Sequence, residues 1–544
     1  MSKNLQELVD SADLALAEYY CKKGEYEKGL ELFKRVSYLL DKDTLTSFNN
    51  YSLTYAKELA QKDKWGEAIE VYKVMLNLPN PPAVTYKNMG LCMKVIDGYK
   101  AAVGFLEQYK ELVPDDVSIL EELGDVVFVG LNDSLTAIRY YEKALKNGRD
   151  NFHVNTMLGH IYSTYYRDSH KKEQMYYLER AYTLNPTDRT AIKNWAFVNG
   201  KFGNTKKADE LYKKMLKNDP THSDVHSYGA YLVRTKRFQE GFKYLRHRFE
   251  KEDLNKEMFS KLFYSDKMYQ PGQDLKGKKV LVHYEQGFGD SILFIRFAKD
   301  LEKITGCKLV GVVVQPQLES LFKSSELDLP IYTVNNGGHL EFDCVIPMMD
   351  LPLAIGLTPE TLKAERSYLK VEEADVKKYK DMYLKDTKKF KVGICYEGSR
   401  ASAETKRDIP LSYFYPLMRM DNVEVYSFQV EDAEGQMDKV PEDCKLIRLG
   451  STFKSWKDTA CAIENMDLMI STDNGVMNLA GALGKKTFGL YNSIAEWRWF
   501  DLTGKDVKWY KTVKPYCCIK NESWEEPMKK VMRDLKECMT PVLV

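Results

Sequence analysis

The stretch EQGFGDSILFIRF, residues 285–297, decides how the second half of this chain is interpreted. It follows KKVLVHY, a short apolar run that predicts a buried strand. Gly287 and Gly289 flank Phe288, Asp290 comes next, and an amphipathic helix is predicted to begin there. Glycines let the backbone turn sharply and let a ligand come close. This turn is therefore a candidate site at the end of a strand.

Apolar runs alternate with amphipathic helices on both sides of this turn. The alternation predicts parallel sheets whose faces are covered by helices. A helical, lysine-rich stretch separates two such sets, so we expect two Rossmann-like subdomains of about 100 residues each. Ligands bind outside the carboxyl ends of the strands in such sheets. The predicted strands are VLVHY, KLVGVVV, IYTV and CVIPM in the first set, and KVGICY, VEVYSFQ, KLIRL, MDLMIST and TFGLY in the second.

A second glycine turn, STDNG (471–475), ends one strand of the second set. Asn474 is a favourable N-cap for the helix predicted over GVMNLAGALG. A helix N-terminus attracts anions through its free N–H groups and its dipole, so a diphosphate would fit there. A capped helix after a strand is also common in any α/β protein, and this plainer interpretation stays open. The glycines at 287 and 289 lack the third glycine of a dinucleotide fingerprint, which disfavours a nicotinamide cofactor.

The first half of the chain carries an internal repeat. Ala68, Ala102 and Ala137 follow one another at intervals of 34 and 35 residues, and Ala208 marks the same register. Each lies in a segment such as KWGEAIEVYKVML, and partner segments such as KNMGLCM and HSYGAYLV supply the second helix of each unit. The small residues let two helices approach closely while apolar residues fill the seam. The pattern predicts a series of helical hairpins.

This unit resembles the tetratricopeptide repeat. An α-helical solenoid of about six or seven units is expected between residues 10 and 250. The many tyrosines of this part are interpreted as packing residues, and the alternative is a concave surface that binds a peptide. The pattern predicts the array and leaves its ligand open.

The composition is that of an ordinary globular protein. The chain has 544 residues, of which 44% are hydrophobic and 29% charged, and a net charge of +1. A chain of this length suggests about three domains. The near-neutral charge does not indicate a nucleic acid or an anionic membrane as partner, although it does not exclude a local patch. No apolar run reaches the roughly 18 residues that span a bilayer, and the polar N-terminus lacks the apolar core of a secretory signal.

The ten cysteines are scattered along the chain. Cys517 and Cys518 are the only close pair, and neither a Cys-x-x-Cys pattern nor a His/Cys cluster at metal-binding spacing occurs. Reduced thiols in a cytoplasmic protein are therefore expected, and no metal site is predicted.

Four pieces of the second half resemble, in their combination and order, the heptosyltransferase-like glycosyltransferases of the GT-B architecture. More narrowly, the chain is similar to the bacterial-type proteins that join tetratricopeptide repeats to that catalytic unit. The likeness covers residues 240 to 540, and the repeats extend it to nearly the whole chain. The pieces are RFQEGFKYLRHRFE (237–250), LVHYEQGFGDSILFIRF (281–297), FDCVIPMMDLPLAIG (342–356), and AIENMDLMISTDNGVMNLAGALGKKTFGLY (462–491) followed by EWRW (496–499).

The resemblance implies transfer of a sugar from a nucleotide-diphosphate sugar to an acceptor, without a cofactor or a required metal. The family's base aspartate follows the glycine of its first turn, which here is Asp290, and Gly287, Phe288 and Gly289 form the acceptor-side turn. A general base must reach the acceptor hydroxyl within hydrogen-bond distance, which a rigid turn at the cleft allows. The alternative role for Asp290 is a plain helix N-cap.

The resemblance also implies the donor-binding positions. The family binds the donor phosphates with a basic residue three positions before a proline, which here is Arg407, before Pro410. A cation there would neutralise charge on the departing diphosphate, and the alternative is a solvated loop charge. Asp473 corresponds to the aspartate near the donor sugar. The remaining positions are Lys406 beside the arginine, Gln429 near the nucleoside, and Asn474, Gly475, Val476 and Met477 with backbone N–H groups toward the diphosphate.

Two donor-binding positions depart from the family pattern. Asn474 stands where Thr or Ser is usual, and an asparagine cap can replace either. Asn478 stands where His is usual, and its amide can form hydrogen bonds but cannot carry a proton or a charge at neutral pH. Any step that needs an imidazole is therefore lost, which implies a weaker activity or a different donor. Trp497 and Trp499 are interpreted as packing residues, with a stacking site as the alternative.

The sequence thus predicts three parts, with a glycosyltransferase as the most economical function. Residues 1–255 form the repeat array, 256–385 the acceptor-side subdomain, and 386–544 the nucleotide-sugar subdomain with a closing C-terminal helix. By analogy with other fusions of this kind, the repeats would hold a polypeptide acceptor. A glycan or modified nucleic acid acceptor stays open, as does an oligomeric state. The competing interpretation is a non-catalytic scaffold with a degenerate transferase unit.

Overall fold

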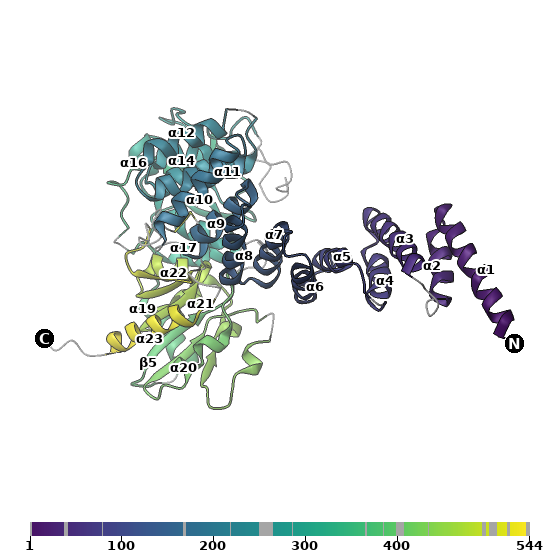
Figure 1. The fold of residues 1–544 in the computed structure, drawn as a ribbon. Coiled ribbons are helices and arrows are strands. Elements are labelled where there is room, and N and C mark those ends of the chain that lie inside the picture. Colours follow the sequence, from purple (N-terminus) through teal and green to yellow (C-terminus); the bar gives the residue numbers. More distant parts are fainter. Residues whose placement is uncertain are drawn as a thin grey trace. The chain divides into compact units, whose positions relative to one another are not determined.

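The structure is a computed structural model of the chain (Figure 1). Two compact units, Met1–Ile161 and Tyr162–Val544, divide the chain, and each is described by itself. The structure describes residues 3–36, 42–78, 80–166, 170–217, 219–249, 265–285, 287–364, 367–384, 386–398, 407–432, 435–491, 497–499, 509–518 and 523–539.

The first unit consists of helices that pack in consecutive pairs, as the repeat pattern predicts. Its helices are α1 (Lys3–Lys22), α2 (Tyr26–Arg35), α3 (Lys42–Gln61), α4 (Trp65–Leu76), α5 (Ala83–Val95), α6 (Tyr99–Leu112), α7 (Ser118–Asp125), the π-helical turn η2 (Val126–Gly130) and α8 (Ser134–Lys146). Helix α9 (Phe152–Tyr165) crosses the division between the units.

Small residues allow the helices of a pair to pack closely. Ala68, Ala102 and Ala137 are fully buried. At Gly124 in α7, an added Cβ would lie 2.6 Å from the ring of Tyr141 in α8, so only glycine fits at this crossing. The repeat register found in the sequence is therefore the register of the helix contacts.

The second unit begins with further helices of the same kind. These are α10 (Lys171–Leu184), α11 (Arg189–Lys201), α12 (Thr205–Met215), α13 (His222–Arg234) and α14 (Phe238–Leu245), followed by the 3-10 helix η3 (Arg246–Phe249). Helix α13 is fixed at its start by a capping box between Thr221 and Asp224. We refer to α13 and α14, which pack against each other, as the last hairpin.

A parallel four-stranded sheet follows, in the strand order β3-β2-β1-β4. Its strands are β1 (Lys279–His283), β2 (Lys308–Val314), β3 (Ile331–Thr333) and β4 (Cys344–Pro347). The chain leaves β1 toward β2 on one side, while β4 lies on the other side. The point between β1 and β4 is therefore a topological switch point, where α/β proteins bind their ligands.

A second parallel sheet has six strands in the order β10-β9-β8-β5-β6-β7. Its strands are β5 (Phe390–Cys395), β6 (Val423–Ser427), β7 (Leu446–Arg448), β8 (Leu468–Thr472), β9 (Thr487–Tyr491) and β10 (Val513–Cys517). The sequence prediction missed β10, which contains Pro515. A proline weakens a strand prediction, but it is tolerated here because β10 lies at the edge of the sheet.

Short helices cover the two sheets. The α-helices are α15 (Phe288–Phe294), α16 (Leu301–Thr305), α17 (Glu319–Ser324), α18 (Leu351–Ala354), α19 (Glu373–Tyr383), α20 (Tyr415–Met418), α21 (Trp456–Glu464), α22 (Gly475–Leu483) and α23 (Glu525–Met539). The 3-10 helices are η5 (Ile295–Phe297), η6 (Pro316–Leu318), η7 (Met348–Asp350), η8 (Leu411–Phe414), η9 (Met437–Lys439) and η10 (Gly450–Thr452). Helix α19 is the lysine-rich helix predicted between the two strand sets.

One hydrophobic core joins the last hairpin to both sheets. It contains Phe238 and Phe242 from α14, Val280 from β1 and Met477 from α22. The predicted fold class is confirmed: a helical repeat region precedes an α/β part with two parallel sheets. The predicted domain boundaries near residues 255 and 385 fall outside the described residues and stay predictions.

Among the described residues, no helix combines the length and the apolar character that crossing a membrane requires.

Candidate active site

The first turn begins helix α15 at the carboxyl end of β1. Gly287 is the N-cap residue of this helix, and the backbone N–H of Asp290 donates to the carbonyl of Gly287 at 3.1 Å. Asp290 is the third residue of the helix, in its first turn, so its alternative role as a plain N-cap is wrong. Its side chain is 18% exposed, which leaves the carboxylate accessible on a rigid support.

The second turn begins helix α22 at the carboxyl end of β8. Asn474 is the N-cap, as predicted, and its Oδ1 accepts from the backbone N–H of Met477 at 3.1 Å. Its Nδ2 donates to the carbonyl of Glu397, just beyond β5, at 3.1 Å. Asn474 therefore ties α22 to the switch point between β5 and β8. Of the N–H groups predicted to face a diphosphate, that of Met477 is taken by this cap.

The two turns are in contact. Helix α15 packs against α22, and a Cβ added to Gly289 would lie 2.9 Å from Nδ2 of Asn478. Phe288 packs on Trp456 of α21 with ring centroids 5.4 Å apart, and the indole of Trp456 in turn covers Gly475. The structure thus brings together the acceptor-side turn and the start of α22, which the sequence assigned to opposite sides of one site.

Asn478, which stands where the resembled family has His, is 7% exposed. Its Nδ2 donates to the carbonyl of Asn474 at 3.2 Å, and its Oδ1 accepts from the hydroxyl of Tyr510 at 3.1 Å. Both ends of the amide therefore have partners within the protein. This arrangement gives Asn478 a structural part in holding α22 and the turn of α15 together.

Arg407 and Asp473 lie side by side. Nε of Arg407 is 4.0 Å from Oδ2 of Asp473, and its Nη1 donates to the backbone carbonyl of Asp473 at 3.5 Å. The hydroxyl of Thr472 donates to the backbone carbonyl of Arg407. The arginine is thus held beside the start of α22. Lys406, its predicted neighbour on the donor side, lies outside the described residues.

Gln429 lies two residues beyond β6 and is held to the end of β5. Its Oε1 accepts from the backbone N–H of Glu397 at 3.1 Å and from the thiol of Cys395 at 3.4 Å. Burial raises the pKa of the Cys395 thiol to about 12, so the thiol is neutral and can donate. Gln429 therefore borders the same strand ends as Asn474.

Sequence reasoning missed the residue that contacts Asp290. Nε of Arg498 donates to Oδ1 of Asp290 at 2.8 Å, and the adjacent Trp499 donates from its indole to Oδ1 of Asp473 at 2.7 Å. One short segment therefore contacts both candidate aspartates. Trp499 was interpreted as a packing residue, and its hydrogen bond adds to that role. In the sequence, the signal for this role was the position of Arg498 between two tryptophans, Trp497 and Trp499.

No group of three or more His, Cys, Asp or Glu side chains in the described part of the chain is arranged to hold a metal ion.

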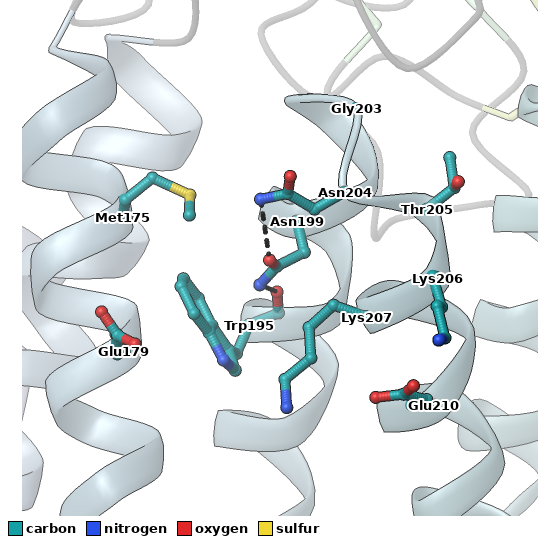
Figure 2. A pocket seen from close by; sticks show the side chains of 10 residues that line it. All are labelled: Met175, Glu179, Trp195, Asn199, Gly203, Asn204, Thr205, Lys206, Lys207 and Glu210. Carbon is teal, nitrogen blue, oxygen red and sulfur yellow. Dashed lines mark hydrogen bonds between the residues drawn. The ribbon is translucent and has the colours of Figure 1, made fainter.

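A second candidate site lies on the repeat helices of the second unit. An open pocket of ≈ 620 Å³ is bordered by α10, α11 and the start of α12. Figure 2 shows Trp195 and Asn199 on the central helix, between Glu179 on one side and Lys207 on the other. Nδ2 of Asn199 donates to the carbonyl of Trp195 at 2.8 Å, and Nδ2 of Asn204 donates to Oδ1 of Asn199 at 3.2 Å. Asn199 and Trp195 are only 2% and 5% exposed, so the groups open to a ligand are the amide of Asn204 and charges of both signs.

A family model and a curated relative match parts of this chain. A family model described as PPR repeat matches residues 15–37 and 198–219, which confirms the helical repeats. Protein FlbA of Caulobacter vibrioides is 24% identical over 286 residues, covering 49% of this chain and 48% of FlbA. The chain thus spans about half the length of this curated relative.

Solved structures are similar to each part. Escherichia coli ADP-heptose LPS heptosyltransferase II matches 48% of this chain and 98% of its own, with 12% identity and a TM-score of 0.36. YrrB, described as a TPR protein with an unusual peptide-binding site, matches 34% of this chain and 91% of its own, with 21% identity and a TM-score of 0.28. MamA of Desulfovibrio magneticus RS-1 matches 31% of this chain and 93% of its own, with 16% identity and a TM-score of 0.29.

Proposed function

We propose that this protein is a glycosyltransferase that moves a sugar from a nucleotide-diphosphate sugar to a hydroxyl group of an acceptor. The observation that carries the proposal is the contact between the two turns. Asp290, at the end of a strand in the first sheet, and Asp473, at the end of a strand in the second, both accept hydrogen bonds from the segment Arg498–Trp499. The proposed base and the start of the proposed donor-binding helix therefore contact one short segment.

Asp290 is proposed as the general base. It would take the proton of the acceptor hydroxyl while the oxygen attacks the anomeric carbon of the donor sugar. The bond from that carbon to the diphosphate breaks in the same step, which inverts the anomeric configuration. The proton ends on Asp290, and the electron pair leaves with the nucleoside diphosphate.

Arg407 and the start of α22 are proposed to hold the diphosphate. The departing group gains negative charge, which a guanidinium and the positive end of a helix dipole would stabilise. Arg407 is held beside this helix by Asp473 and Thr472. The sequence resemblance supports transfer without a required metal, because the family it points to works in this way. Lys406, Val476 and Gln429 remain proposed contacts on the same side.

A polypeptide is the acceptor that we propose. The pocket among α10, α11 and α12 presents the exposed amide of Asn204 beside exposed side chains of both charges. Amides can pair with a peptide backbone whatever its sequence. A glycan or a modified nucleic acid would use the same base and donor site. We also propose the cytoplasm as location, because all ten cysteines are free thiols.

A non-catalytic scaffold is the second candidate, and Asn478 is the observation that favours it. The amide is nearly buried and paired with Asn474 and Tyr510, so no titrating group stands at this position of the site. In that case the repeats would bind a partner and the α/β part would at most bind a nucleotide.

Donor turnover tests the proposal. The protein would be incubated with UDP-glucose, UDP-N-acetylglucosamine, GDP-mannose, GDP-fucose and ADP-glucose, and release of the nucleoside diphosphate would be measured by chromatography. Water can serve as a slow acceptor, so the assay does not require the natural one. Release by the wild type and its loss in Asp290→Asn would support a glycosyltransferase. Binding of a nucleoside diphosphate without any release would favour the scaffold.

A further inference from the structure

We propose that Arg498 is a positioning residue for Asp290, and that the last hairpin of the repeats holds Arg498 in place. The inference rests on the proposed function, because it gives Asp290 the role of base. It adds a residue from a distant part of the chain to the acceptor side of the site. It also means that the last hairpin helps to position the proposed base of the transferase.

The ion pair itself is the first step of the argument. Nε of Arg498 lies 2.8 Å from Oδ1 of Asp290, and the two side chains are 24% and 18% exposed. A charge-assisted hydrogen bond of this length fixes the direction of a carboxylate better than a neutral one does. In the described residues, Oδ2 of Asp290 receives no hydrogen bond, so it is the oxygen left to take the acceptor's proton.

Two tryptophans hold Arg498 in turn. Its guanidinium lies over the ring of Trp497, 4.7 Å from the centroid, which is a favourable cation–π geometry. Its backbone carbonyl accepts a hydrogen bond from the indole of Trp509. Both the side chain and the backbone of Arg498 are therefore fixed.

The last hairpin packs on both tryptophans. His226 of α13 and Phe242 of α14 contact Trp497 edge-on, with centroid distances of 6.3 and 6.4 Å. Phe238 of α14 stacks on Trp509 at 5.7 Å. The two phenylalanines and both tryptophans belong to the core that also contains strands of the first sheet. Phe294 and Phe297 of the α/β part also contact Trp509, at centroid distances of 6.4 and 6.3 Å, so the repeats share the support of Arg498 with the helix that carries Asp290.

A second connection reaches the same turn from its other side. Arg248, which follows the last hairpin, donates to both carboxylate oxygens of Glu285 at 2.7 and 2.9 Å and to Asp350 at 2.8 Å. All three side chains are almost fully buried. Glu285 lies two residues before Gly287. The hairpin and its exit therefore anchor the turn both before Gly287 and at Asp290.

The test compares Arg498→Met and Arg498→Lys with wild type in the full chain. Turnover of the donor that the wild type consumes is measured for kcat and KM, and affinity for UDP, GDP and ADP by calorimetry. Millimolar guanidinium chloride is added to Arg498→Met. Trp497→Leu tests the support from the hairpin. Arg419→Met, which breaks an exposed pair with Asp443 remote from the turn, is the control.

We expect Arg498→Met to lower kcat about 10- to 100-fold with donor KM and nucleotide affinity unchanged, because misplacing a base by a small distance costs this much. Arg498→Lys or guanidinium should restore part of it, and Trp497→Leu should lower kcat in the same way. A loss of nucleotide affinity, or wild-type kcat in Arg498→Met, would overturn the inference and leave the proposed function standing. No turnover of any donor by the wild type would overturn both.

Discussion

Gly289 of α15 and Asn478 of α22 meet so closely that a single added Cβ would lie 2.9 Å from the amide nitrogen. The contact joins the turn that follows β1 to the helix that follows β8. Because the amide is hydrogen-bonded at both ends, it cannot move away without losing a bond. The spacing between the proposed base and the proposed donor helix is set here.

Gly289→Ala should therefore lower the thermal stability. The methyl group must displace a buried and paired amide, which costs about 1–2 kcal/mol. Gly338→Ala is the control, because this glycine lies in an exposed turn where a Cβ meets nothing within 4 Å. Differential scanning calorimetry of both variants measures the effect. Equal melting temperatures of Gly289→Ala and its control would contradict the close contact between Gly289 and Asn478.

Asp290→Asn should abolish transfer and leave donor binding nearly intact. The amide keeps the shape of the side chain but cannot accept a proton from the acceptor, so kcat should fall about 100- to 10,000-fold. Asp300→Asn, in the same part of the chain and 45% exposed, is the control. Wild-type turnover in the asparagine variant would remove Asp290 from the role of base.

Arg407→Ala should weaken nucleotide binding. A charge-assisted contact to a phosphate contributes roughly 1.5–3 kcal/mol, which corresponds to a loss of about ten-fold or more in affinity. Isothermal calorimetry with the nucleoside diphosphate that the wild type binds measures it. Arg419→Ala, on the same α/β part, should bind as the wild type does. An unchanged dissociation constant in Arg407→Ala would refute its phosphate role.

Asp534 of α23 makes the docking of the C-terminal helix depend on pH. Burial alone would raise its pKa, but hydrogen bonds from Lys514, Tyr516 and Arg533 lower it to about 2, from an ordinary value of 3.8. A carboxyl group whose pKa is lowered by folding stabilises the folded state at pH values above its ordinary pKa. That stability is lost as the pH falls toward 2.

Asp534→Asn should therefore be less stable than the wild type at pH 6. Water screens the exposed Lys514 and Arg533, so we expect a difference of about 1–2 kcal/mol. The difference should shrink between pH 4 and pH 2, as urea unfolding at several pH values would measure. Glu537→Gln, an exposed change on the same helix, is the control. A difference that stays constant with pH would contradict this reasoning.

Local patterns predicted much of the fold. The regular spacing of small residues predicted the repeat helices. Apolar runs predicted every described strand except β10, which contains a proline that is tolerated at the edge of the sheet. Asn474 was recognised as a cap because capping depends on residues that are neighbours in sequence. These features need no knowledge of distant contacts.

The arrangement of the site could not be predicted in the same way. Arg498 is 208 residues from Asp290 in sequence, and the packing of Trp497 and Trp509 on distant parts of the chain, the last hairpin among them, brings the two together. The buried pairs of Arg248 with Glu285 and Asp350 likewise join segments that are 37 and 102 residues apart. Such contacts depend on tertiary packing, which a single sequence does not encode as a local pattern.

The most direct test of the central claim is a thermal-shift measurement of the full chain with UDP, GDP, ADP and dTDP and their sugar conjugates. A ligand that binds only the folded state raises the melting temperature by mass action. The account predicts a clear rise with one nucleotide and its sugar, and a smaller rise in Arg407→Ala. No rise with any of them at millimolar concentration would contradict a donor site between Arg407 and the start of α22.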